Sequence, residues 1–145
     1  MNSKNNNKLS KITLKNVSWI KLNKKGLIED PSIKLENKAA IYIYQFKNKS
    51  IFYVGSTRYL ASRIKRHSYL ANNGKKGCPK FYNFIRKYGW VNIKLGILEY
   101  LDISVFNIED KHDIKKFIFN KEQYYLDMLN PYLNIEKRAG VYTKV

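Results

Sequence analysis

Two short apolar segments, separated by a polar turn, constrain the fold of this chain more than any other feature of its sequence. They lie in the stretch IYIYQFKNKSIFYVGST, residues 41–57, where most apolar positions carry aromatic or β-branched side chains. Such side chains favour strands, and two such segments around a polar turn are typical of a β-hairpin. We therefore expect strands at residues 40–46 and 51–56, with a turn at KNKS.

A symmetric turn defines how the two strands of this hairpin pair. Tyr44 then lies opposite Tyr53, and Tyr42 lies opposite Gly55. Because side chains alternate between the faces of a sheet, the three tyrosines and the glycine share one face. Gly55 has no side chain, so a ligand or another backbone segment has room to approach there. Tyrosines are also favoured in strands for packing alone, and for the isolated hairpin this structural interpretation stays open.

The remaining sequence predicts three helices and one more strand. Ser56–Thr57 provides an N-cap for the first helix, Pro79 opens the second, and Pro131 follows the third. The order β-β-α-α-β-α predicts an α+β fold in which helices flank a small three-stranded antiparallel sheet. The helices are expected at residues 58–73, 79–88 and 111–129, and the third strand at residues 90–100.

The length of 145 residues and a hydrophobic content of 44% predict one domain with a core of its own. Residues 1–38 are polar and basic, which is typical of an N-terminal arm or linker. Within them, VSWIKL is able to add a short strand or to dock on the domain. Residues 39–136 are expected to form the domain, and residues 137–145 a short C-terminal tail.

Several protein classes are excluded by composition. The chain has no stretch of 18 apolar residues, so we expect no transmembrane helix, and its N-terminus lacks the apolar region of a secretory signal. Its single cysteine, Cys78, excludes a disulfide framework and a cysteine-cluster zinc site. A free thiol in a reducing compartment is the expected state.

The charge distribution predicts a polyanion as partner. The formal net charge is +17, and residues 37–98 contain 13 Lys or Arg but no Asp or Glu. Lysine and arginine displace counterions from phosphates, and the interleaved aromatic side chains suit stacking, so nucleic acid is the expected partner. The alternative is a solubilising surface. Lys outnumbers Arg 23 to 5, which with abundant Asn, Ile and Tyr is typical of an AT-rich gene.

Two basic side chains share one face of the first expected helix. Arg63 and His67 are four residues apart and project together, whereas Arg66 points away from them. An Arg holds phosphate oxygens bidentately, and a neighbouring His orients or transfers a proton. The alternative interpretation is a solvated basic face.

One carboxylate lies on or beside the apolar stripe of the last helix. Glu122 is four residues from Ile118 and three from Tyr125. A carboxylate on the buried side needs a partner, and magnesium is often held by one or two carboxylates together with water and phosphate. An ion pair with a lysine is the alternative. Asp127 is a weaker candidate because five residues rotate it about 140° around the helix.

Taken together, these residues resemble the GIY-YIG nuclease family. The family's two signature triplets correspond to Ala40-Ile41-Tyr42 and, after ten residues, Tyr53-Val54-Gly55. Arg63 and His67 follow on a helix, GILE is similar to the family's third strand, and KEQYYLDMLNPYLNI is similar to its closing segment. That segment places the family's Glu at Glu122 and its Asn at Asn134. The similarity covers about residues 39–136, and Ala40 departs from the first Gly of the signature.

The resemblance implies a DNA endonuclease that hydrolyses phosphodiester bonds with one divalent cation, Mg²⁺ or Mn²⁺. It implies that Glu122 holds the metal, that Tyr42 or Tyr53 assists deprotonation of the attacking water, and that Arg63 stabilises charge on the phosphate with support from His67. The candidate catalytic residues are thus Tyr42, Tyr53, Arg63, His67 and Glu122, and the candidate substrate-binding residues are Gly55, Lys65, Arg66 and Asn134.

The closing segment and the AT-rich composition also resemble fungal mitochondrial intron-encoded homing endonucleases. That resemblance implies duplex DNA as substrate, a monomer and the mitochondrial matrix. Only nine residues follow Glu136, which leaves a truncated product, a stand-alone nuclease and a domain reused for binding as alternatives. The second hypothesis is a non-catalytic nucleic-acid-binding protein, for example a mitoribosome-like ribonucleoprotein component with RNA as partner. A DNA repair nuclease is a third, weaker interpretation.

Overall fold

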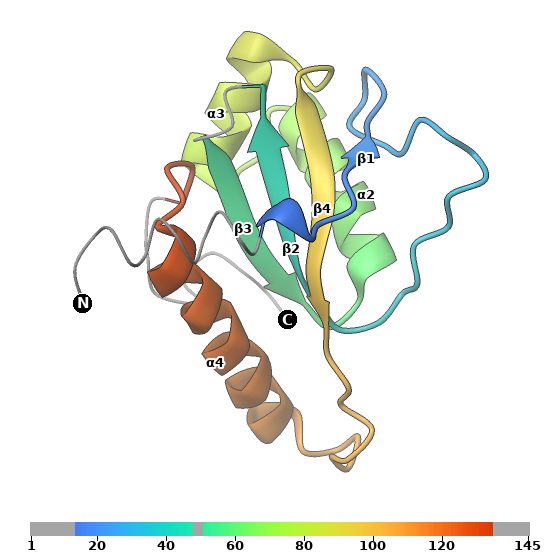
Figure 1. Cartoon of the computed structure of the whole chain (residues 1–145), viewed down its shortest axis with the longest axis vertical. Helices are drawn as coiled ribbons and strands as arrows, with labels where there is room; N and C mark the ends of the chain where they lie inside the picture. Colours follow the sequence, from blue (N-terminus) through green and yellow to red (C-terminus); the bar gives the residue numbers. More distant parts are fainter. Residues whose placement is uncertain (1–13, 48–50, 135–145) are drawn as a thin grey trace.

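The computed structural model describes residues 14–47 and 51–134, and it has an α+β fold as expected. Its sheet has four strands in the order β1-β4-β2-β3, and every neighbouring pair is antiparallel (Figure 1). The expected count of three strands is wrong by one, because the VSWIKL segment adds a two-residue strand to the outer edge of β4. The strands are β1 (Ile20–Lys21), β2 (Ala40–Phe46), β3 (Phe52–Thr57) and β4 (Ile93–Tyr100).

The hairpin pairs in the predicted register. Tyr42 lies opposite Gly55, and Tyr44 lies opposite Tyr53. The Phe46 backbone N–H donates to the Ile51 carbonyl at 2.9 Å beside the turn, whose residues 48–50 lie outside the described part of the chain. Alternation along β2 therefore sends its tyrosines to one face of the sheet and its isoleucines to the other.

Helices cover both faces of this sheet, so the protein has two apolar clusters. The helices are α2 (Leu60–Asn72), α3 (Pro79–Tyr88) and α4 (Lys111–Leu129). On one face Tyr42 and Tyr44 pack with residues of α2 and α3, and on the other Ile41 and Ile43 pack with residues of α4. Figure 1 shows α2 and α3 behind the sheet and α4 in front of it.

Helix α2 begins differently from the prediction. Ser56–Thr57 does not cap it, because both residues belong to β3 or its end and the helix starts at Leu60. The free backbone donors of its first turn are satisfied by the preceding segment instead. The Leu60 N–H donates to the Lys38 carbonyl, and the Ser62 N–H donates to Oδ1 of Asn37, each at 3.0 Å. Asn37, which lies 25 residues before Ser62 in the sequence, thus caps the helix in place of the expected local residue.

The segment before β2 is packed on the domain rather than being a free arm. Leu22 is 1% exposed in the cluster under α2 and α3, and Leu14 and Trp19 pack against the cluster on the α4 face. The described residues 14–38 therefore belong to the folded body, whereas residues 1–13 and the expected tail at 137–145 lie outside the described residues. None of the described helices is both long enough and apolar enough to span a membrane.

The docking of the N-terminal segment predicts that Gly96 on β4 cannot be enlarged without cost. A methyl group there would collide with the Val17 side chain and lie 3.0 Å from the Trp19 ring. We expect Gly96→Ala to lower the free energy of unfolding by about 1–3 kcal/mol, measured by urea denaturation. In a Val17→Ala background the same substitution should cost clearly less. An unchanged stability for Gly96→Ala would contradict the docking of residues 14–19.

Candidate active site

Tyr42 lies at the centre of the face that α2 and α3 cover, and it is fully buried. Its ring extends over Gly55, because a methyl group added at Gly55 would come within 2.5 Å of the hydroxyl oxygen and of a ring carbon of Tyr42. The space that the glycine leaves is therefore occupied by the Tyr42 ring. Gly55, expected to leave room for a ligand, instead allows the neighbouring tyrosine to cross the strand.

His67 is hydrogen-bonded through both of its ring nitrogens. Nε2 lies 2.5 Å from the Tyr42 hydroxyl, and Nδ1 lies 2.8 Å from the hydroxyl of Tyr82 on α3. All three side chains are at most 1% exposed. Sequence reasoning missed Tyr82. The available signal was its place on the apolar face of α3, because a tyrosine hydroxyl that is buried needs a partner.

The environment of the Tyr42–His67 pair disfavours charge. Burial and the nearby Arg63 guanidinium lower the pKa of His67 to about 3, so its imidazole is neutral at physiological pH. Burial raises the pKa of Tyr42 well above its ordinary value, Arg63 opposes that rise, and Glu122 adds to it. Tyr42 thus stays protonated unless further positive charge approaches.

Arg63 lies on the same face of α2 as His67, as their four-residue spacing predicts. It is half-buried, and its charge lowers the pKa of His67 and acts in the same direction on Tyr42. The structure thus brings the arginine, the histidine and the first signature tyrosine together. A phosphate that reached this part of the molecule would meet a guanidinium beside two polar side chains.

Tyr53 is held in a different way from Tyr42. Its hydroxyl lies 3.0 Å from the sulfur of Cys78, and its ring stacks on Phe81 with centroids 4.4 Å apart. Cys78 is a free, buried thiol, as expected. Burial is the main reason that the pKa of Tyr53 is raised well above its ordinary value. Both signature tyrosines are therefore in the same apolar cluster; the hydrogen-bond partner of Tyr42 lies on α2, and that of Tyr53 is the residue just before α3.

Tyr44 packs in this cluster without a polar contact. It is 1% exposed, and its ring contacts Tyr42 edge-on, with centroids 5.9 Å apart. Its hydroxyl has no hydrogen-bond partner among the described residues. Tyr44 shares the face with the candidate catalytic tyrosines but contributes packing.

The two other basic residues of α2 are separated from the centre of the site. Lys65 is exposed and lines a cavity of about 300 Å³ on the outer side of the helix, together with Leu35. Arg66 is also exposed, and its charge opposes the rise that burial causes in the pKa of Tyr82. The structure therefore does not bring Lys65 to the site and leaves Arg66 on the side of α3.

Glu122 is the carboxylate whose charge acts on both signature tyrosines, Tyr42 and Tyr53. It is 2% exposed on α4, and its charge raises the pKa of both Tyr42 and Tyr53. No three His, Cys, Asp or Glu side chains in the described ranges gather into a metal-binding group. The donor set therefore does not fit zinc, which needs three or four protein ligands, but fits a hard cation that takes one carboxylate plus water and phosphate oxygens.

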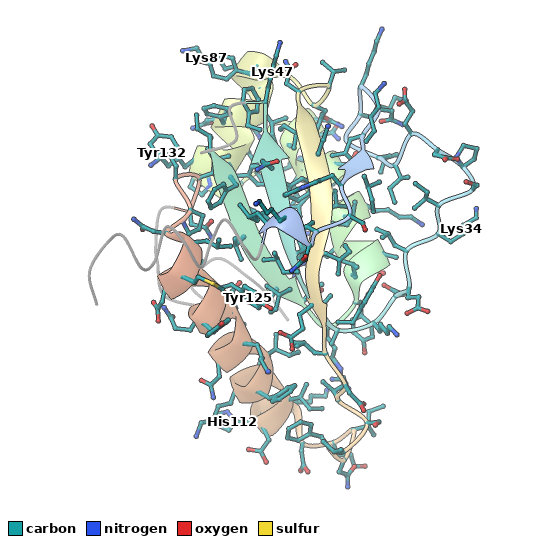
Figure 2. The ribbon with its side chains drawn as sticks, viewed as in Figure 1. Lys34, Lys47, Lys87, His112, Tyr125 and Tyr132 are labelled. Carbon is teal, nitrogen blue, oxygen red and sulfur yellow. The ribbon has the colours of Figure 1, made fainter. Side chains whose placement is uncertain are left out.

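Helix α4 is fixed to the sheet close to Glu122. The Tyr125 hydroxyl donates to Oε1 of Glu99 on β4 at 2.8 Å, and Lys121 lies 3.4 Å from the other oxygen of that carboxylate. Figure 2 shows Tyr125 between α4 and the sheet. Asp127 is exposed and accepts a hydrogen bond from Gln123, which agrees with its expected direction away from Glu122.

Asn134 holds the edge strand of the sheet. Its side-chain oxygen accepts from the Val54 N–H at 3.0 Å, and its amide nitrogen donates to the Val54 carbonyl at 2.9 Å. The Leu133 N–H donates to the Phe52 carbonyl at 3.1 Å. Asn134 therefore fixes β3, which carries Tyr53 and Gly55, and the contacts of its amide are with backbone.

The neutral, buried imidazole of His67 predicts a loss of stability in mild acid. The pKa of His67 is about 3 in the folded protein, whereas an unperturbed histidine has a pKa of about 6.5. As the pH falls below about 6.5, the unfolded chain binds a proton that the folded protein does not. The free energy of unfolding should thus fall by about 2 kcal/mol from pH 7.5 to pH 5.

Chemical denaturation at several pH values measures this effect. His67→Gln should be less stable at neutral pH, but its stability should depend less on pH by the same amount. His112 is present in both proteins, so its contribution cancels. An equal pH dependence of the two proteins would show that His67 is not buried as a neutral ring.

Comparison with known proteins agrees with this geometry. The model of the GIY-YIG catalytic domain matches residues 38–134, about two thirds of the chain. No curated protein and no solved structure matches the chain significantly. The matched region contains the hairpin, both signature tyrosines, Arg63, His67, Glu122 and Asn134. The chain therefore belongs to the GIY-YIG family of nucleases.

Proposed function

We propose that this chain is a metal-dependent endonuclease that cuts duplex DNA and is of the homing type found in mobile introns. Family membership supports phosphodiester cleavage, with a nucleic acid as substrate. The observation that carries the proposal is the position of the buried Glu122 carboxylate, whose charge reaches the hydrogen-bonded Tyr42 and its neighbour Tyr53. Arg63 supplies positive charge to the same group.

Glu122 would hold one Mg²⁺ or Mn²⁺ ion, which when bound supplies positive charge for the phosphate and lowers the pKa of nearby hydroxyl groups. Tyr42 is the better candidate for the base. Burial is the main influence on the pKa of both tyrosines and raises it, but Arg63 acts to lower the pKa of Tyr42 and is not among the influences on Tyr53.

The proposed reaction begins when Tyr42 loses its proton to solvent on substrate binding. Its phenolate oxygen then takes a proton from the attacking water, whose oxygen forms the new bond to phosphorus. The bond to the leaving oxygen breaks, and that oxygen takes a proton from solvent. Arg63 stabilises the negative charge that develops on the phosphate. His67, whose pKa is about 3, is a poor proton acceptor, so it orients Tyr42 and holds its oxygen.

The AT-rich composition and the closing segment of the domain support the assignment to fungal mitochondrial intron-encoded enzymes. On that basis we place the protein in the mitochondrial matrix, as a monomer.

The non-catalytic alternative is favoured by one observation. Tyr42, Tyr53, His67 and Glu122 are each at most 4% exposed, so a scissile phosphate does not reach them in this conformation. Stable co-sedimentation with a large RNA particle, without metal-dependent cleavage, would support the alternative.

Replacing the Glu122 carboxylate by an amide tests the proposed metal site. We expect Glu122→Gln to abolish Mg²⁺-dependent nicking of plasmid DNA while binding of a DNA duplex in EDTA is retained, because an amide is a weak magnesium ligand. Asp127→Asn is the matched control, since it removes a negative charge from an exposed position on the same helix. Nicking by Glu122→Gln at the rate of the unsubstituted protein would show that Glu122 is not the metal ligand.

A row of lysines at one end of the sheet is well placed to attract phosphates. Lys21 on β1 lies directly opposite Lys94 on β4, although like charges across a strand pair are unfavourable. These two lysines and Lys47 line a groove of about 440 Å³ without a carboxylate in its lining. Lys21 also pairs with the exposed Glu29 at 3.3 Å. Figure 2 shows Lys47 at this end of the molecule.

The lysine row predicts opposite effects of one substitution on stability and on binding. Lys94→Glu replaces a like-charge pair by an ion pair, so the free energy of unfolding should rise or stay unchanged. Binding of a DNA duplex in EDTA should weaken several-fold. For the unsubstituted protein, the slope of log binding constant against log salt concentration should be steeper than about −2, and Lys94→Glu should make it shallower by about 1.

Lys34→Glu is the matched control, because it changes the net charge equally at an exposed position on the segment between β1 and β2 (Figure 2). Fluorescence anisotropy over a range of salt concentrations measures the slopes. A slope shallower than about −2 for the unsubstituted protein would contradict a groove that contacts several phosphates. Equal weakening by both substitutions would mean that net charge, and not the lysine row, controls binding.

A further inference from the structure

A groove of about 620 Å³ lies at the end of the sheet where β3 and β4 finish and β2 begins, which is the lower end in Figure 1. Arg58 and Tyr59, which lead into α2, line it together with Tyr100 and the loop that follows β4. The lysine row is at the opposite end of the sheet, where β2 ends and β4 begins. The two grooves are therefore separate features of the surface.

The register of the sheet brings two tyrosines to this groove from different strands. Ala40 pairs with Thr57 of β3 on one side and with Tyr100 of β4 on the other. Neighbouring strands are about 4.8 Å apart, so the backbones at Thr57 and Tyr100 are separated by about 10 Å. Tyr59 follows Thr57 by two residues. Because directly opposite residues share a face of the sheet, Tyr100 projects on the side that α2 covers, as Ala40 does.

Backbone hydrogen bonds fix the position of both tyrosines. The Tyr59 carbonyl accepts from the Arg63 N–H at 3.0 Å, and the N–H of Leu101, the residue after Tyr100, donates to the Ala39 carbonyl at 2.8 Å. The side chains of Tyr59 and Tyr100 are nevertheless 50% and 41% exposed. Two aromatic rings are thus held on a rigid backbone but are left in contact with solvent, which is the form of a stacking platform.

Each of these tyrosine rings has a cation over it. Nζ of Lys38 lies 4.9 Å from the centre of the Tyr100 ring, and the guanidinium carbon of Arg58 lies 5.7 Å from the centre of the Tyr59 ring. Lys38 also pairs with the exposed Glu36, whereas none of the carboxylates in the described ranges forms an ion pair with Arg58. A nucleotide needs both features, because its base stacks on an aromatic ring and its phosphate pairs with a cation.

The competing occupant is a basic, apolar segment of a protein partner. Asp102 also lines the groove, and its Oδ1 accepts hydrogen bonds from the backbone N–H and the hydroxyl of Ser104, at 2.9 Å and 2.6 Å. Ile108 is 72% exposed in the same lining. A protein segment of that kind would pair with Asp102 and cover Ile108. The two cations at the tyrosine rings would repel it, however, and they favour an anion with a planar ring.

We propose that this groove binds an unpaired nucleotide of a nucleic-acid strand, with its base against Tyr59 and Tyr100 and its phosphates beside Arg58 and Lys38. The backbone contact between Tyr59 and Arg63 places the groove one helical turn from the candidate active site. The proposal concerns binding and does not rest on cleavage by the domain. Because every base has an aromatic face, the groove tolerates any sequence.

Binding of a short single strand tests the proposal. We expect Tyr59→Leu to weaken binding of a labelled oligonucleotide of about eight nucleotides by about tenfold, measured by fluorescence anisotropy in EDTA. Tyr59→Phe keeps the ring and should bind as the unsubstituted protein does. Tyr69→Leu is the matched control, because it removes a 53% exposed tyrosine that lies on α2 outside the groove. Equal affinities of Tyr59→Leu and Tyr69→Leu would overturn the proposal.

The charged residues of the groove give a second measurement. Arg58→Gln should make the slope of log binding constant against log salt concentration shallower by about 0.7, the value for one phosphate of a single strand. Lys34→Gln is the control, since it removes the same charge at an exposed position outside the groove. Asp102→Asn keeps an acceptor for Ser104 and should tighten binding. Strand binding that is unchanged in every groove variant would leave a protein segment as the occupant and overturn the proposal.

The outcomes separate this groove from the proposed function. The same oligonucleotide made as DNA and as RNA identifies the source of the strand, because only RNA offers a 2′-hydroxyl group. A protein that cuts no DNA, but whose single-strand binding is selectively weakened by Tyr59→Leu, would retain the groove and lose the proposed function. A protein that nicks plasmid DNA, but binds the strand equally in all groove variants, would retain the proposed function and lose the groove.

Discussion

The hydrogen bond between the Tyr42 hydroxyl and Nε2 of His67 is the interaction on which the site depends. It joins the central strand of the sheet to α2 in a region that the described protein shields from water. Because Tyr42 reaches His67 only by crossing β3, Gly55 must lack a side chain. Because both partners are buried, neither is charged in the free protein. The glycine at position 55, the pairing of β2 with β3 and the uncharged states of Tyr42 and His67 are therefore all linked to this one buried contact.

Local sequence patterns were sufficient for the parts of the site that lie on one helix or on one hairpin. Strand alternation placed Tyr42, Tyr53 and Gly55 on one face, and the observed register agrees. Helical spacing placed Arg63 with His67 and turned Asp127 away from Glu122. Both predictions rest on fixed periods of 2.0 and 3.6 residues, which a chain obeys wherever the element forms. They need no knowledge of how elements pack.

Contacts between distant segments could not be predicted in this way. The cap of α2 comes from Asn37, the fourth strand from residues 20–21, and the fixing of β3 from Asn134, which is 80 residues from its partner Val54. Tyr82 is a similar case, since only the packing of α3 on α2 brings its hydroxyl to His67. Each contact joins two elements whose relative position is decided by burial of apolar area. A polar side chain near such a junction has no periodic signal of its own.

The hydrogen-bonded polar groups in the apolar cluster bear on whether this domain is an enzyme or a reused binding module: Tyr42, His67 and Tyr82 form one set, and Tyr53 and Cys78 form another. A buried hydroxyl contributes little net stability even when it is hydrogen-bonded, and costs about 1–3 kcal/mol when it is not. Phenylalanine at position 82 and alanine at position 78 would fill much of the same space without that requirement. A module that only binds needs no such hydrogen bonds. The burial of the candidate residues argues for the binding role, but a conformational change can open a closed site. Packing alone does not account for buried polar side chains that are all hydrogen-bonded. The unpartnered hydroxyl of Tyr44, in the same cluster, shows that satisfied polar groups are not automatic here. The pairing of Tyr42, His67 and Tyr82 is therefore better explained by chemistry than by folding.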